Sequence, residues 1–119
     1  MATINKVIEY VDGVKPNAYD EEAKFQWMCE LDGMVARLVM QLDEPPRYGF
    51  PRDMDTQLLI PAPFEAAYAQ YMEAMIDYHN REYGHYNNSL SMFNAALEAY
   101  SKAYIRENRP PSAGAFTGF

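Results

Sequence analysis

The sequence predicts an all-α protein, a small four-helix bundle with a long proline-rich loop and an extended C-terminal arm. Apolar residues recur at steps of three and four over most of the chain, a spacing typical of helices that bury one face. All but one of the eight prolines lie in one internal stretch or close to the C-terminus, where they interrupt that spacing. Because 119 residues bury a single core, we expect one helical domain at residues 1–109 and an extended arm at residues 110–119.

The first helix is expected at residues 3–12. Thr3 can accept a hydrogen bond from the first turn as an N-cap, and Gly13 can end the helix. Its apolar face consists of Ile4, Val7, Ile8 and Val11. A helix this short is not stable alone, so this face must pack against the rest of the chain.

A longer helix is expected at residues 20–42, with Asp20 as its N-cap. Its buried stripe is expected to contain Phe25, Met28, Leu31, Val35, Leu38 and Leu42. Gly33 lies inside this helix and lowers its stability, so it marks either a close crossing by another helix or a kink. Cys29 lies beside the stripe, and we interpret it as a small packed residue rather than a reactive thiol.

Two further helices, at residues 64–84 and 88–107, are expected to form an antiparallel hairpin. The buried stripe of the first contains Phe64, Tyr68, Tyr71, Met72, Met75 and Ile76, and its polar side contains Glu65, Gln70, Glu73, Asp77 and Arg81. The buried stripe of the second contains Leu90, Phe93, Leu97, Tyr100 and Tyr104. Gly84 is expected to end the first helix, and Asn87 or Asn88 to cap the second.

The loop at residues 43–63 is a candidate contact surface. It carries five prolines and a glycine, and a loop of this length in a small domain is usually functional. Tyr48 and Phe50 are expected to be exposed anchors for a partner. Its β-compatible part, which includes Leu58, Leu59 and Ile60, could pair with the edge of a neighbouring subunit. The alternative is that the loop folds back on its own domain.

The C-terminal arm has no helical pattern but carries features of a docking peptide. Arg106 and Arg109 close the last helix, where positive charge suits the helix dipole. Pro110 and Pro111 then extend the chain, and small residues lead to Phe116 and Phe119. These two rings could enter pockets of another protein. The alternative is a solubilising tail, although such tails are usually richer in charge.

The composition excludes several classes of function. A net charge of −7 weighs against ordinary nucleic-acid binding, which needs Lys and Arg to neutralise phosphates. No apolar run approaches the roughly 18 residues of a membrane span, and the N-terminus has no basic-then-apolar leader. The single Cys29 cannot form an internal disulfide, which fits a reducing compartment. We therefore expect a protein made in a cytoplasm, without a membrane partner.

One pair of residues has the spacing of metal ligands. Glu82 and His85 are placed as in helical di-iron carboxylate sites, which need a second such pair and facing carboxylates. Here there is one pair, and it straddles Gly84, where the helix is expected to end. The chain also has no glycine-rich phosphate loop and no cysteine pair. We expect no catalytic residue, no metal and no cofactor, and thus a protein that is not an enzyme.

Several short phrases carry a resemblance to a known family. They are Leu31-Asp32-Gly33, Asp55-Thr56, Leu58-Leu59-Ile60-Pro61, Met75-Ile76-Asp77-Tyr78, Tyr86-Asn87-Asn88-Ser89 and Met92-Phe93-Asn94-Ala95. With the overall pattern, they resemble the small head–tail connector proteins, also called neck adaptors or head completion proteins, of tailed bacteriophages and prophages. The resemblance spans roughly residues 3–109, and it is weakest at residues 45–54 and in the arm.

The resemblance implies a structural protein of the virion neck that is assembled in the cytoplasm of a bacterial host. Such a subunit joins a ring of its own copies, typically a dodecamer, between the portal protein and the stopper or another neck or tail protein. The ring extends the DNA channel, and DNA passes through it without sequence-specific binding. The acidic balance suits a channel wall that DNA slides past. The alternative from another class is a cytoplasmic helical protein-binding or regulatory module.

Overall fold

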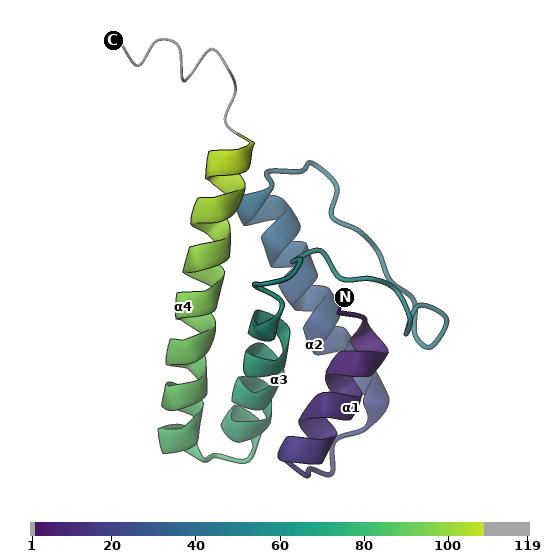
Figure 1. The fold of residues 1–119 in the computed structure, drawn as a ribbon. Helices are drawn as coiled ribbons and strands as arrows, with labels where there is room; N and C mark the ends of the chain where they lie inside the picture. Colours follow the sequence, from purple (N-terminus) through teal and green to yellow (C-terminus); the bar gives the residue numbers. More distant parts are fainter. Residues whose placement is uncertain (1, 109–119) are drawn as a thin grey trace, which may run out of the picture.

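The computed structural model describes residues 2–108, and this part of the chain is all-α as predicted (Figure 1). The helices are α1 (Ile4–Val14), α2 (Glu21–Met34), the π-helix η1 (Val35–Val39), α3 (Ala66–His79) and α4 (Tyr83–Glu107). Within residues 2–108 there is no β-strand, only one isolated antiparallel bridge between Thr3 and Gln57. No helix in this range is both long and apolar enough to cross a membrane.

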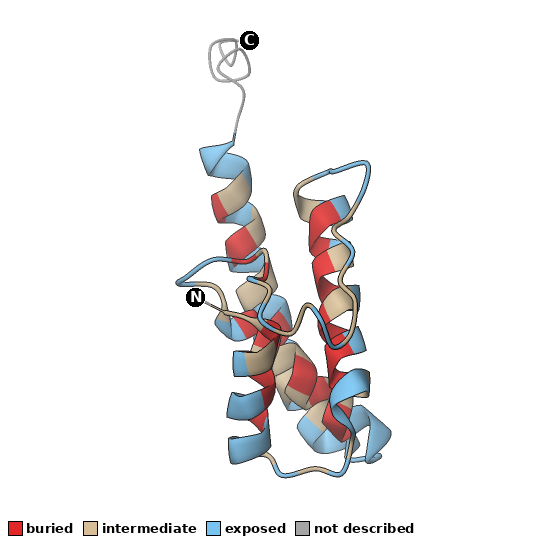
Figure 2. Cartoon of the chain, turned by 90° about the vertical axis from the view of Figure 1, so that its right-hand side faces the viewer, coloured by how far each residue is buried: buried red, intermediate tan, exposed pale blue. Residues whose placement is uncertain are grey.

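Helix α3 lies at the centre of the fold and contacts α1, α2 and α4 (Figure 1). Its buried residues are Ala67, Tyr68, Met72, Ala74, Ile76 and Asp77. The expectation that Asp77 belongs to the wet side of this helix is wrong, because its exposed fraction is 0%. Figure 2 shows the buried residues facing inward between the helices, with exposed residues on their outer faces. A helix packed on three sides has no single buried stripe, so a polar residue such as Asp77 can become buried, and its carboxylate is hydrogen-bonded by Lys15 and Ser89.

The first two helices begin where their capping residues predict. The Thr3 hydroxyl accepts a hydrogen bond from the Lys6 N–H at 3.2 Å. The Asp20 carboxylate accepts one from the Ala23 N–H at 2.9 Å. These side chains satisfy backbone donors that have no partner within the helix. All four residues of the expected apolar face of α1 are buried.

Helix α2 departs from the expected pattern at its C-terminal end. The backbone widens into η1, where the Met40 N–H donates to the Val35 carbonyl at 3.0 Å. Gln41, with φ 56°, then ends the helix in a left-handed conformation. The wider turn moves later side chains off the buried stripe. The expectation that Leu38 and Leu42 are buried is therefore wrong, since they are 76% and 43% exposed.

Gly33 is not a close crossing point. A Cβ atom added to this glycine would meet nothing within 4 Å, which contradicts the first of the two interpretations of this residue. The change of helix geometry begins two residues later, at Val35. The glycine is therefore not required by a packed neighbour.

The hairpin turn between α3 and α4 lies earlier than predicted. The Arg81 N–H donates to the Tyr78 carbonyl at 3.0 Å, and the Glu82 N–H donates to the Asp77 carbonyl at 2.9 Å. This pair of bonds is a Schellman motif, which places one residue in the left-handed region. That residue is Arg81, with φ 63°, rather than a glycine. Gly84 instead lies in the first turn of α4, so the predicted break at Gly84 and the cap at Asn87 or Asn88 are wrong.

We expect Arg81→Gly to raise the free energy of unfolding by about 1 kcal/mol. A left-handed residue with a Cβ is strained by about 1 to 2 kcal/mol, and the greater freedom of glycine in the unfolded chain offsets part of the gain. Chemical denaturation of both proteins measures the difference. The matched control is Asn80→Gly, which should lower stability because Asn80 has φ −81° and gains nothing from glycine. Equal effects of the two changes would contradict the assignment of the turn.

Candidate interaction surfaces

The loop between η1 and α3 folds back on its own subunit. It passes beside the N-terminus before returning to the start of α3 (Figure 1). The Met54 carbonyl accepts from the Asn5 N–H at 2.8 Å, and the Leu58 N–H donates to the Ala2 carbonyl at 2.9 Å. The extended segment thus pairs with the N-terminus of the same chain. Of the two interpretations of this loop, the structure shows the alternative, in which it folds back on its own domain.

The predicted anchors of this loop point inward. The Tyr48 hydroxyl donates to the Asp32 carboxylate at 2.8 Å, and the Phe50 ring packs edge-on against Phe25 with centroids 5.4 Å apart. Leu58 and Ile60 are 3% and 1% exposed, and Leu59 is half-buried. The expectation that Tyr48 and Phe50 are exposed is therefore wrong. Aromatic rings bury more surface against a core than in a solvated loop, so Tyr48 and Phe50 pack against the core of their own subunit.

A buried carboxylate holds this loop to two helices. Asp32 in α2 is fully buried, and it accepts hydrogen bonds from the hydroxyls of Tyr68 at 2.6 Å and Tyr48 at 2.8 Å and from the Leu59 N–H at 3.1 Å. The Tyr68 hydroxyl also accepts from the Ile60 N–H at 2.6 Å. Burial raises the pKa of Asp32, and the three hydrogen bonds oppose part of that rise. Burial and the charge of Asp32 raise the pKa of Tyr68.

This network is structural. All its donors come from the chain itself, and the carboxylate has no exposed surface. Sequence reasoning did not single out Asp32 as a buried residue, although it stands directly after Leu31 of the apolar stripe. That position beside a buried residue is the one signal that could have indicated it.

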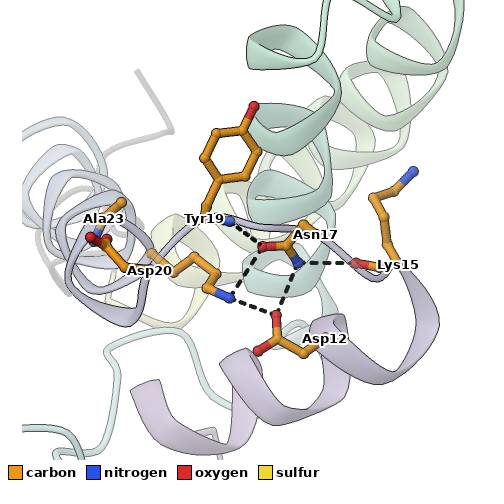
Figure 3. Close-up of polar contacts among 7 residues, drawn as sticks. Asp12, Lys15, Asn17, Tyr19, Asp20 and Ala23 are labelled. Carbon is orange, nitrogen blue, oxygen red and sulfur yellow. Dashed lines mark hydrogen bonds and ion pairs between the residues drawn. The ribbon is translucent and has the colours of Figure 1, made fainter.

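A second polar cluster joins α1 to α2. The Lys24 side chain is 4% exposed, and its ammonium donates to Asp12 Oδ1 at 2.7 Å and to Asn17 Oδ1 at 3.2 Å. The Asn17 amide donates to Asp12 Oδ1 and to the Lys15 carbonyl, both at 3.0 Å (Figure 3). Asn17 also accepts from the Tyr19 N–H at 3.1 Å, so one side chain organises the whole connection (Figure 3). The cluster explains why a lysine is tolerated on a buried face.

A third cluster surrounds Asp77. Its carboxylate accepts from the Lys15 ammonium at 2.9 Å and from the Ser89 hydroxyl at 3.3 Å, which ties α3 to the end of α1 and to α4. The neighbouring hollow of about 390 Å³ also exposes His85. Glu82 and His85 are both exposed, and Glu82 precedes α4. Among residues 2–108, no three histidine, cysteine or acidic side chains are grouped to hold a metal ion.

Cys29 is a half-buried thiol beside this core. Burial, with the negative charges of Asp32, Glu30 and Asp53, raises the pKa of Cys29 to about 11. The thiol is therefore protonated at neutral pH and a poor nucleophile. This agrees with the interpretation of Cys29 as a packed residue.

An aromatic surface occupies the end of the molecule at the α3–α4 turn. Tyr78 is 49% exposed and Tyr83 is 54% exposed. The Tyr78 ring contacts those of Tyr83 and Tyr86, with centroids 6.3 and 5.3 Å apart. Tyrosine is favoured at protein interfaces, since its ring buries well while its hydroxyl stays hydrated. We call Tyr78, Tyr83 and Tyr86 the aromatic surface, and sequence reasoning did not assign it to an interface.

Of the residues predicted in the arm, only Arg106 lies within the described residues 2–108. It is exposed in the last turn of α4, where its charge suits the helix dipole. The other predicted contacts lie outside the described residues: Arg109, Pro110, Pro111, Phe116 and Phe119. Their roles stay predictions.

No protein-family model, no curated protein and no solved structure matches this chain. The likeness to head–tail connector proteins thus depends on the short sequence phrases and on the helical pattern alone.

Proposed function

We propose that this protein is a structural head–tail adaptor of a tailed bacteriophage, which forms a ring between the portal and the stopper or tail. The observation that supports this most is the placement of exposed apolar and aromatic groups at both ends of the α3–α4 hairpin. Tyr78 and Tyr83 are exposed at the turn, and Leu38 and Ile105 are exposed toward the other end. A subunit that bridges two larger assemblies needs one such surface for each.

Ring formation requires two different patches that meet head to tail around a closed axis. The aromatic surface offers one patch of this kind. A net charge of −7 suits the wall of a channel, because like charge lets DNA pass without adhering. The proposed role needs no catalysis and no cofactor. We further propose that the arm, with Arg109 and the two phenylalanines beyond it, binds a neighbouring neck protein such as the portal.

The test is the presence of the protein in particles. We expect mass spectrometry of purified, DNA-filled particles from the bacterium that encodes the protein to find about twelve copies per particle, as for one closed ring. Absence from such particles would contradict the proposal and favour the helical regulatory module.

The same experiment can test the aromatic surface. We expect particles complemented with the double variant Tyr78→Ser and Tyr83→Ser to contain at least about tenfold fewer copies, since hot-spot tyrosines dominate interfaces. The matched control is Tyr10→Ser, which changes a tyrosine in α1 that is 59% exposed. Circular dichroism should show that all variants fold. Normal incorporation of the double variant would show that this surface is not an interface.

A further inference from the structure

Some apolar side chains at the end of α2, in η1 and in the C-terminal half of α4 are not covered by the rest of residues 2–108. Leu38 is 76% exposed, Ile105 is 59% exposed and Met34 is 40% exposed. A small hollow of about 60 Å³ between η1 and α4 is lined only by Met34, Val35, Leu38, Val39 and Leu97. Ile105 lies eight residues beyond Leu97, which turns it by about 80° around α4, so it is not part of this hollow. We call Met34, Leu38 and Leu97 the apolar patch.

The exposure of Leu38 follows from the π-helical turn. A regular α-helix would keep Leu38 on the stripe of Phe25, Met28, Leu31 and Val35, whereas η1 turns it outward. Contiguous exposed apolar groups usually mark a surface that another segment or protein covers. A segment that covers the apolar patch needs apolar side chains and a length of chain sufficient to reach it.

The sequence that follows Asn108 has apolar side chains and is long enough to reach the patch. Its sequence contains Phe116 and Phe119, and the preceding residues 112–115 are small enough to let a backbone lie close to a surface. Asn108 lies at the C-terminal end of α4, on the side of the molecule where η1 ends (Figure 1). Along α4, Leu97 is about 17 Å from Asn108 at 1.5 Å per residue. A chain from Asn108 to Phe116 spans at most about 26 Å, so it reaches the patch.

We propose that in the free subunit Phe116 and Phe119 cover the apolar patch of their own chain. A short tether gives the arm an effective concentration on the order of millimolar at this surface, far above the concentration of a second copy in dilute solution. The arm then keeps the patch from associating with other apolar surfaces. If the proposed adaptor function also holds, the patch and the neighbouring neck protein compete for the same two rings.

Disulfide trapping on the purified full-length chain tests this, in a Cys29→Ser background. The test pair is Leu38→Cys with Phe116→Cys. The matched control is Tyr83→Cys with Phe116→Cys, because Tyr83 is also exposed but lies about 37 Å from Asn108 along α4, beyond the reach of residue 116. Both replaced helix residues are on the surface, so folding is retained. Under mild oxidation, we expect the test pair to form an intramolecular disulfide at least about tenfold faster than the control.

The products of the oxidation show whether the arm of the same chain or the arm of a second copy covers the apolar patch. A fast-migrating monomer on non-reducing gels, with a rate independent of protein concentration, supports the proposal. A disulfide-linked dimer that increases with concentration would overturn it and show that the arm of a second copy lies on the patch. Equal rates for the two pairs, or no disulfide in either, would also overturn it. The experiment uses the isolated protein, so its result does not depend on whether the protein is a phage adaptor.

Discussion

Replacing Asp32 with alanine is expected to lower the free energy of unfolding by about 3 kcal/mol or more. The change leaves the hydroxyls of Tyr68 and Tyr48 and the Leu59 N–H without their acceptor. Each buried donor without a partner costs about 1 to 3 kcal/mol, and the cavity left by the side chain adds to this. Urea denaturation followed by circular dichroism measures the loss.

The matched control for this change is Asp55→Ala, because Asp55 is an exposed aspartate in the same loop. It should alter stability by less than about 0.5 kcal/mol. If Asp32→Ala had an effect as small as the control, Asp32 would not hold the loop to α2 and α3. Hydrogen exchange would show the same distinction locally, since the Leu59 and Ile60 amides should lose protection in the Asp32 variant only.

The free energy of unfolding should also depend on pH through the titration of Asp32. Burial raises the pKa of Asp32 above its ordinary value of 3.8, so the folded protein holds this proton more tightly than the unfolded chain. Protonation of Asp32 therefore stabilises the folded protein fully at pH values below the pKa of Asp32 in the unfolded chain. This stabilisation is lost as the pH rises through the pKa of Asp32 in the folded protein. The stability of the wild type relative to Asp32→Asn should therefore fall as the pH rises above about 4. A difference that grows over this range would contradict the raised pKa.

The second large effect is expected from Phe25→Ala, which should lower the free energy of unfolding by about 3 to 5 kcal/mol. Phe25 is fully buried in α2, and its ring also supports Phe50 of the loop at 5.4 Å. Removing it creates a cavity beneath both elements. Thermal and chemical denaturation measure the loss, and exposure of the loop should increase its rate of limited proteolysis.

The control at this position is Phe25→Leu, which keeps most of the volume and should cost about 1.5 kcal/mol or less. Retention of full stability by the alanine variant would mean that the loop does not pack on α2 through this ring. A loss of stability without any change in proteolysis of the loop would place the effect in the helices alone.

Much of the fold could be predicted because helix starts and buried stripes are local. The caps Thr3 and Asp20 act on amides three residues ahead, so the sequence around them is sufficient to locate α1 and α2. The turn at Arg81 could not be predicted in the same way. A glycine three residues later, Gly84, was the stronger local signal, but the hydrogen bonds of the Schellman motif placed the left-handed residue at an arginine.

The helical class, the apolar face of α1 and the buried stripe from Phe25 to Val35 can be predicted from local spacing, because a repeating spacing shows which side of a helix avoids water. The orientation of Tyr48 and Phe50 depends on long-range packing, since a loop has no repeating face and an aromatic ring suits a core and an interface equally well. The burial of Asp32 was decided in the same way. Its main donor, Tyr68, is 36 residues away along the chain. A buried polar group is stable only where distant segments bring it all its partners at once, and no local pattern contains that information.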